Sequence, residues 1–591
     1  MAMKTVLISM PWADYQYPSI QIGQLAAFAR GKGFQVDVLN LHLKMASAIG
    51  IDSYEKIFLS EKNIGEQISA FLLFPENKPI PKSFQNKIAN TGESIKCISD
   101  AIRNIYSRID WKKYSLAGFT INFDQLFASL LFAKWLKRDF PNIKIVFGGP
   151  CVANTIGASI LKCFQQVDLC VDGEGEIAFT KILKRLSRHE MNWAKHVPGL
   201  IYRFNGDVRI NIRKQLTKLN DLPDPDYDDY FNLIKTDKSL NKSGIMPFLQ
   251  VESSRGCYHR CAFCSIPDYW SGYRARPPEQ VAEQIMRLCN KYNTNQLYFS
   301  DVIISPRCDE RYFAMLQKQK HDYNMFYEIH SGVRKSLLSA MHRAGVRTVQ
   351  IGIEALSSRL LRKMNKGVRV IDNVQTMKFC EELDIEHTSN MMFNFPSETQ
   401  QDINESIRNI GFLLSFRPPF NHCNFELRHN SPVYNTPERF GIKEVRENKY
   451  INSDILPDEI RNKLILVGKQ YSCERTHINY RRLKCALNAW RAKYEQSLLD
   501  NQKLLCYYDC IKFIRIEDYR FGEMCITLDG YIRELYLFCD SYKSFNEIIK
   551  CFLKWDPREI KKVLNKLVKL KVMFREDDDY LSLAIRANGP K

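Results

Sequence analysis

The sequence predicts an α/β protein with two consecutive series of alternating strands and helices, followed by a smaller α+β region. Three observations predict this class. Short runs rich in Val, Ile, Leu and Phe alternate with helical periods over the first 190 residues. The same alternation begins again near residue 248, after a connector rich in Pro and Asp. Beyond residue 456 the alternation stops.

The first series, residues 1–190, is predicted to form a parallel sheet, because its strands are separated by helices rather than by tight turns. Helices are expected at 20–32 and 126–137, and the insert at 48–108 is expected to be mostly helical. The expected strands are 5–10, 36–39, 116–120, 143–147 and 167–171.

Residues 191–245 are predicted to be a linker with a hairpin near 198–202 and a Pro/Asp connector at 222–227. The second series then occupies residues 246–455. Six strands with intervening helices predict an open, partial (β/α)6 barrel, whose active site should lie at the C-terminal ends of the strands. The expected strands are 248–252, 296–300, 326–330, 348–353, 388–393 and 423–427.

The last region, residues 456–591, is predicted to be helical after Pro457 and to end in a small domain at about 510–590. That domain is expected to contain a strand at 523–528, three helices and a final short hairpin. The helices are expected near 530–538, 544–553 and 557–571.

Composition limits the class of protein. The chain has 591 residues, of which 45% are hydrophobic and 26% are charged, which is typical of a globular protein with several cores. No run approaches the roughly 18 apolar residues of a membrane span, and the first apolar run is too short for a signal peptide. We therefore expect a soluble cytoplasmic protein without a membrane partner, in which the 18 cysteines are reduced.

The net charge of +19 is spread along the chain rather than concentrated in one stripe. The densest basic run, at 561–571, alternates with Val and Leu, which is typical of an amphipathic helix with a solvated face. We therefore expect no nucleic-acid partner.

Cys257, Cys261 and Cys264 form a C-x3-C-x2-C motif directly after the first strand of the second series. Three thiolates in one short loop can each hold one iron of a [4Fe–4S] cluster, and no fourth cysteine is nearby, so the fourth iron would accept a small ligand. A structural zinc site usually needs four closed ligands, and His259, inside the spacer, is badly placed to complete one. The motif therefore favours the cluster.

This motif, after the first strand of a partial barrel and with Phe263 before its last cysteine, resembles the radical S-adenosylmethionine (SAM) superfamily. The resemblance implies that the open iron binds SAM, which is cleaved to methionine and a 5′-deoxyadenosyl radical with an electron from a donor such as flavodoxin or ferredoxin. Phe263 matches the aromatic residue beside the adenine. Ser300, Asp301, Glu328, Glu354 and Asn390 are candidate SAM contacts, although ordinary hydrogen bonding at a barrel end is an equal alternative.

The first series carries glycines at three strand ends, where a backbone can approach a ligand closely. In order and ahead of the cysteine loop, they resemble the Rossmann-like cobalamin-binding domain of cobalamin-dependent radical SAM enzymes. The loop at 10–18 has no histidine to ligate cobalt, and His42 is expected to be a surface or core residue, so we expect cobalamin without a protein histidine. The candidate cobalamin contacts are Gly118, Thr120, Gly148, Gly149, Pro150, Gly173, Glu174, Gly175 and Glu176.

Five segments resemble radical SAM enzymes that mature ribosomally synthesised peptides: 18–23, 221–231, 251–257, 394–399 and 429–434. This resemblance implies C-methylation of a precursor peptide, with methylcobalamin as methyl donor and a second SAM to regenerate it. The last domain resembles a winged-helix leader-recognition domain, which would bind the peptide's leader as an added strand, unless it only caps the barrel. The sequence assigns no catalytic residue.

Three other functions stay open. A leader-guided epimerase or cyclase would use the radical without methyl transfer. A tRNA methylthiotransferase would need a second set of three cysteines in the first domain, and Cys97, Cys151, Cys163 and Cys170 do not form one. A non-catalytic iron–sulfur recognition protein is the remaining alternative.

Overall fold

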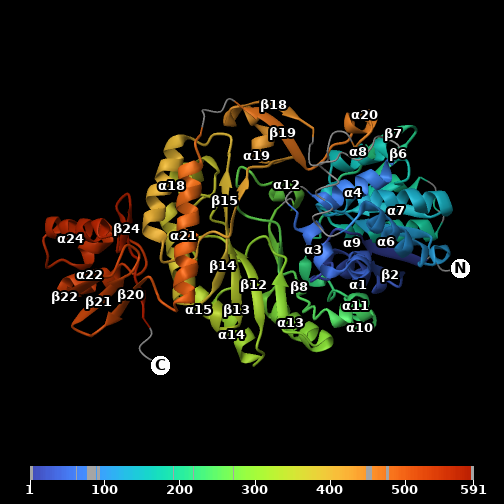
Figure 1. Ribbon diagram of the computed structural model, residues 1–591. Coiled ribbons are helices and arrows are strands. Elements are labelled where there is room, and N and C mark those ends of the chain that lie inside the picture. The colour runs from blue at the N-terminus through green and yellow to red at the C-terminus, as the bar shows by residue number, and fades with distance from the viewer. Residues whose placement is uncertain are drawn as a thin grey trace.

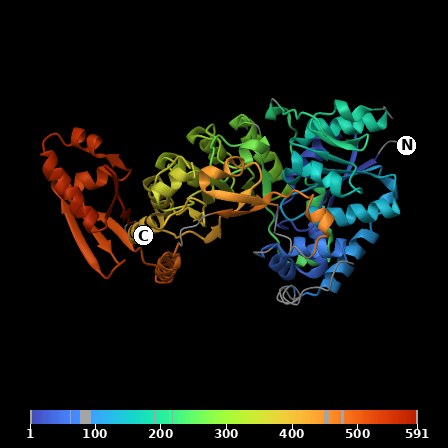
Figure 2. The same cartoon turned by 90° about the horizontal axis from the view of Figure 1, so that it is seen from above.

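A computed structural model describes residues 4–60, 63–75, 88, 93–188, 190, 192–216, 218–270, 272–447, 455–473 and 478–587. Two α/β units and a smaller α+β domain follow one another along the molecule (Figure 1). The barrel lies between the N-terminal unit and the C-terminal domain in both views (Figure 2). No helix among these residues is long and apolar enough to cross a membrane.

The N-terminal unit contains a sheet with the order β2-β1-β3-β4-β5-β6-β7. The first five strands in this order are parallel, as predicted. The order reverses between β1 and β3, and in sheets of this type ligands bind at that point, beyond the C-terminal ends of the strands. The five strands are β1 (Lys4–Ser9), β2 (Gln35–Asn40), β3 (Leu116–Thr120), β4 (Lys144–Gly148) and β5 (Leu169–Val171).

Helices cover both faces of this sheet, which gives two apolar cores. One face packs on α1 (Ile20–Arg30) and α9 (Gly175–Ser187). The other packs on helices that include α2 (Leu41–Ile49), α7 (Leu126–Asp139) and α8 (Thr155–Cys163). The described part of the insert is helical, as predicted, in α3 (Ile51–Phe58), α4 (Ile64–Leu73) and α6 (Ile95–Ser107).

The predicted hairpin is present as β6 (Leu200–Phe204) and β7 (Asp207–Ile210), but it is part of the N-terminal sheet rather than of a free linker. The apolar residues Leu200 and Ile201 pair with Val171 and Cys170 of β5, so burial at the sheet edge holds the hairpin in place. The chain then runs through α10 (Asp228–Thr236) and α11 (Lys238–Lys242) to the barrel.

The barrel has the six predicted parallel strands, of which the fifth is broken at Ser389 and the sixth begins two residues earlier than expected. The strands are β8 (Leu249–Val251), β11 (Gln296–Phe299), β12 (Asn324–Ile329), β13 (Val346–Ile351), β14 (Glu386–Thr388) with β15 (Asn390–Phe393), and β16 (Asn421–Asn424). Its helices are α13 (Pro278–Tyr292), α14 (Glu310–Lys318), α15 (Lys335–Arg343), α16 (Ser358–Lys363), α17 (Val370–Glu382) and α18 (Gln400–Leu413).

The prediction that the chain turns helical after Pro457 is wrong over two stretches. Residues Gly468–Cys473 form β19, which pairs with β17 (Leu427–Arg428) and β18 (Ile442–Arg446). Strands β20 (Leu505–Asp509) and β21 (Phe513–Asp518) follow the long helix α21 (Arg481–Leu499). Pairing with β17 and β18 outweighs the local preference in the polar segment of β19, whereas β20 and β21 pair with each other as a hairpin.

The C-terminal domain has the predicted helices and hairpin. Its sheet has the order β22-β21-β20-β26, and the helices α22, α23 and α24 follow β22. A second small sheet has the order β23-β25-β24. The elements are β22 (Met524–Asp529), α22 (Gly530–Phe538), β23 (Lys543–Ser544), α23 (Phe545–Cys551), α24 (Pro557–Lys569), β24 (Met573–Glu576), β25 (Asp579–Ser582) and β26 (Ile585–Arg586).

Candidate active site

The three cysteines lie in the loop that follows β9 (Ser254–Arg255) and precedes α12 (Ile266–Trp270). Cys261 is buried, and Cys257 and Cys264 are partly exposed. The loop needs Gly256 at its start, because φ is +89° there and a Cβ would lie 2.3 Å from the carbonyl oxygen of Gly272. Among the described residues, no three His, Cys, Asp or Glu side chains are grouped so that they could hold one metal ion. The three thiols of the loop do not form such a group either.

Asp301, predicted as a SAM contact, binds the two serines where β9 begins, just before the cysteine loop. Its carboxylate accepts hydrogen bonds from the Ser253 amide at 3.1 Å and from Ser254 Oγ at 2.6 Å, and also from the Ser254 amide. Burial raises the pKa of Asp301 to about 7, against the opposite effect of these hydrogen bonds. Ser300, its neighbour, donates to the carbonyl oxygen of Val251 at 3.2 Å.

Lys366 is a buried cation beside the cysteine loop that the sequence did not single out. Its ammonium lies 3.2 Å from Glu354 Oε1 and 5.8 Å from the centre of the Phe263 ring. Nearby charges raise its pKa against burial, Glu354 and Cys261 being the largest contributors. Gly352 leaves the space for this side chain, since a Cβ there would lie 2.5 Å from Nζ.

The other predicted SAM contacts lie at the same end of the barrel. Glu354 has φ of +60°, its backbone forms an isolated β-bridge with Met391, and its carboxylate accepts a hydrogen bond from Lys366. Burial raises the pKa of Glu328 to about 7, and Asp301 adds to this increase. Asn390 is exposed, and the contact described for it is made by its backbone, whose carbonyl accepts the Glu354 amide at 3.2 Å.

The glycine motifs meet in one cavity of about 200 Å³ at the ends of the N-terminal strands. Thr120 Oγ1 is buried there without a hydrogen-bond partner in the described structure. Gly148 has open space where a Cβ would be, whereas a Cβ on Gly149, with φ of +107°, would lie 2.7 Å from the Ile121 carbonyl oxygen. The cavity is lined by Gly118, Thr120, Gly148, Gly149, Gly173, Glu174, Gly175 and Glu176, but not by Pro150.

Glu174 and Glu176 border this cavity, but their carboxylates bind the barrel. Arg255, two residues before Cys257, lies 2.7 Å from Glu176 and 3.6 Å from Glu174. It also pairs with Glu252 at 2.9 Å and packs over Trp270, while Arg274 pairs with Glu174. Arg255 was not predicted as a site residue from the sequence, although its position two residues before Cys257 indicates a place near the site.

This ion cluster joins the two predicted sites. The same cavity is lined from the barrel side by Glu252, Arg255, Trp270 and Ser300. Arg255 and Trp270, which lie before and after the cysteine loop, therefore face the glycine-lined strand ends across one space.

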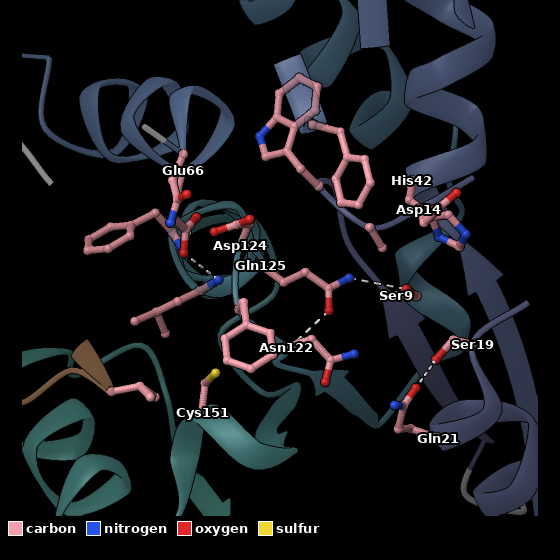
Figure 3. Close-up of a pocket in the computed structure, with 18 of the residues that line it drawn as sticks. Ser9, Asp14, Ser19, Gln21, His42, Glu66, Asn122, Asp124, Gln125 and Cys151 are labelled. Carbon is pink, nitrogen blue, oxygen red and sulfur yellow. Dashed lines mark hydrogen bonds between the residues drawn. The ribbon is translucent and has the colours of Figure 1, made fainter. Parts of the chain in front are cut away.

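A second cavity, of about 630 Å³, lies between the N-terminal unit and the β17–β19 region. Figure 3 shows Glu66 and Asp124 on one side of it and His42 and Asp14 on the other. Glu66 accepts the Leu126 amide at 2.9 Å at the start of α7. Burial raises the pKa of Asp124 to about 6, and Glu426 across the cavity adds to this increase.

The predicted loop at 10–18 forms part of this second cavity, and so does His42. His42 is a core histidine with 1% of its surface exposed. Burial lowers its pKa to about 4, against the opposite effect of the backbone of Ser9 and Tyr17. Its imidazole is therefore neutral at physiological pH.

Comparisons with known proteins agree with the barrel assignment. Residues 251–410 match the family model of the Radical SAM superfamily. The chain is 27% identical over 298 residues to the uncharacterized methyltransferase PH0819 of Pyrococcus horikoshii, an alignment that spans 50% of this chain and 63% of the relative.

Two solved structures share the fold over most of the chain. One is the cobalamin-dependent S-adenosylmethionine radical enzyme OxsB with aqua-cobalamin bound, with a TM-score of 0.55, 15% identity, and 96% of this chain and 71% of that chain covered. The other is the radical S-adenosylmethionine methyltransferase TsrM from Kitasatospora setae with cobalamin and a [4Fe–4S] cluster bound. Its TM-score is 0.56, with 14% identity and coverage of 83% of this chain and 91% of that chain.

Proposed function

We propose that this protein is a cobalamin-dependent radical SAM methyltransferase that methylates a carbon atom of a ribosomally synthesised peptide. The observation that carries the proposal is the shared cavity: its walls are the glycine-lined strand ends on one side and, on the other, Arg255 and Trp270, which lie before and after the cysteine loop. Methyl transfer from cobalamin to a radical-bearing substrate needs the cobalamin and the cluster with its SAM to lie close to one space. The similarity to a methyltransferase by sequence and to two cobalamin-bound structures supports the methyl transfer and the cobalamin in this proposal.

The residues present fit both groups. Cys257, Cys261 and Cys264 would each hold one iron, with the fourth iron open to SAM. Thr120 Oγ1 and the open space at Gly148 suit a polar ligand that lies close to the sheet backbone. When bound, the cluster supplies the electron that cleaves SAM, and methylcobalamin supplies the methyl group.

The chain's own residues would position these reactants. Lys366 offers a buried cation for the carboxylate of SAM, and Phe263 beside it offers an apolar face for the adenine. Asp301 binds Ser253 and Ser254 and so fixes the strand from which the cysteine loop begins. The second cavity, next to the first and bordered by Asp124 and Glu426, is where we place the peptide residue to be modified.

We further propose that the C-terminal domain binds the leader of the precursor peptide. Strand β22 is an edge strand of its sheet, so its outer backbone groups can pair with an added strand. Helix α24 presents Lys562, Lys566 and Lys569 to solvent or near it, which suits an acidic leader. Thr527→Glu, at an exposed position of β22, should weaken leader binding in fluorescence anisotropy, whereas Thr527→Val should not.

The decisive experiment is mass spectrometry of the precursor peptide encoded beside this gene, after anaerobic incubation with the reconstituted enzyme, SAM and methylcobalamin. We expect a methylated peptide, with 5′-deoxyadenosine and S-adenosylhomocysteine in about equal amounts if the carbon is unactivated. 5′-Deoxyadenosine without S-adenosylhomocysteine or mass gain would instead identify an epimerase or cyclase. The Cys257→Ala/Cys261→Ala/Cys264→Ala protein should lose iron and form neither product.

A further inference from the structure

The segment formed by α16 and the turn that leads into α17, residues 358–371, contacts two distant parts of the chain. Toward the barrel axis it holds the cysteine loop. The carbonyl oxygen of Met364 accepts the Ala262 amide at 2.8 Å, and Asn365 Nδ2 donates to the carbonyl oxygen of Arg260 at 2.6 Å. Both loop residues lie between the first and last cysteines of the motif. Lys366 adds its contact with Phe263.

On its other side the same segment is held by the C-terminal domain. Glu576, the last residue of β24, accepts the Ile371 amide at 2.8 Å with one carboxylate oxygen and the hydroxyl of Ser358 with the other. Ser358 Oγ in turn accepts the Val370 amide at 2.8 Å. One carboxylate therefore ties together both ends of the segment, and Ser358 itself is buried.

Both partners of Glu576, Ser358 and Ile371, lie in residues 358–371. Asp579 of β25 pairs with Arg369 at 2.5 Å and so strengthens the same attachment. Other contacts of the same domain lie outside residues 358–371: Asp540 binds Lys378 of α17 at 2.6 Å and Lys335 of α15 at 2.9 Å. The interface can thus be weakened at Lys335 without touching residues 358–371.

We propose that Glu576 is a positioning residue that couples the C-terminal domain to the cysteine loop through residues 358–371, so that docking of this domain controls the geometry in which SAM is bound. The inference rests on the proposed function for the identity of the loop's ligands. Its physical basis is that one segment carries both sets of hydrogen bonds: Glu576 with Ser358 and Ile371, and Met364 with Ala262. Because the packed segment resists deformation, release at one end displaces the other.

The first test needs no cofactor. Hydrogen–deuterium exchange of the full-length protein before cluster reconstitution reports on the Ala262 amide, which is protected by its bond to Met364. Glu576→Ala should speed exchange in the peptide around Ala262 by about fivefold, the factor expected for loss of one ordinary hydrogen-bonding contribution. Glu576→Gln keeps an acceptor oxygen and should restore protection.

Two control variants separate this coupling from general loosening. Lys335→Met removes a contact of the same interface on α15, and Glu559→Gln changes an exposed carboxylate of the same domain. Neither should change exchange around Ala262. Equal acceleration in Glu576→Ala and Lys335→Met, or none in either, would overturn the proposal.

The second test uses the reconstituted, reduced protein. Electron paramagnetic resonance should show a SAM-induced shift of the cluster signal in the wild type. In Glu576→Ala we expect the same iron content but a several-fold higher SAM concentration for half of the shift. If the wild type shows no cluster signal, the proposed function fails, while the exchange result still stands. If the wild type responds and Glu576→Ala responds identically, the coupling is refuted.

Discussion

Arg255 is the residue whose removal should most strongly separate the barrel from the N-terminal unit. It is 6% exposed and faces three carboxylates, those of Glu176, Glu252 and Glu174. Arg255→Met keeps much of the apolar stem but leaves buried negative charges without their cation. Removing one partner of a buried ion pair costs about 3–5 kcal/mol, because the remaining charge stays desolvated.

The assay is thermal unfolding of the full-length protein by scanning calorimetry. For a cooperative unit of 150–250 residues, 1 kcal/mol lowers Tm by about 2–4 °C, so Arg255→Met should lower the main transition by about 10 °C. Arg287→Met is the matched control, because Arg287 pairs with Asp224 at 2.7 Å but is half exposed. An exposed pair contributes about 0–1 kcal/mol, so this variant should shift Tm by no more than about 4 °C.

A double variant tests the pairing itself. In Arg255→Met/Glu176→Gln the buried charge is removed together with its partner, so the loss of stability should be smaller than the sum of the two single variants. Additive losses would show that Arg255 acts through packing against Trp270 rather than through its carboxylates. Equal Tm values for Arg255→Met and Arg287→Met would refute the reasoning.

Three further predictions concern the sites themselves. Gly149→Ala should destabilise the fold by about 1–3 kcal/mol in urea unfolding, because its Cβ would clash with Ile121. Gly148→Ala should keep the stability of the fold but reduce uptake of hydroxocobalamin. A larger loss of stability in Gly148→Ala than in Gly149→Ala would contradict the cavity assignment. Lys366→Met should raise the Kd for SAM about tenfold, measured by equilibrium dialysis, without loss of iron; an unchanged Kd would exclude a carboxylate contact. The pKa of His42 is about 4 in the folded state against 6.5 for an ordinary histidine, so it contributes up to about 3 kcal/mol of stability above pH 6.5 that is lost as pH falls toward 4. The unfolding free energy of His42→Gln should therefore decline less steeply than that of the wild type between pH 6.5 and pH 4. Parallel curves for the two proteins would refute this.

Much of the fold could be predicted from the sequence. The parallel strands of both series lie within a few residues of their expected positions, because a buried strand is a local apolar run bounded by turn residues. The helices of the C-terminal domain were predicted because their pattern is also local. Asp556 and Ser544 cap two of these helices.

The sequence by itself also predicted where the two candidate sites lie. The cysteine loop and the glycine motifs were both found as short contiguous patterns, and parallel strands bring their C-terminal ends to one edge. The family model that matches residues 251–410 includes the cysteine loop and every candidate SAM contact.

Only the tertiary structure decided what the charged residues do. Glu176 pairs with a residue 79 positions away, and Asp301 binds two serines 47 and 48 positions before it. Lys366 and Glu576 depend on the packing of whole elements, and β19 depends on two distant strands. Hydrophobic period and turn chemistry are local properties that single segments carry, whereas an ion pair or a strand pairing exists only between segments that folding brings together.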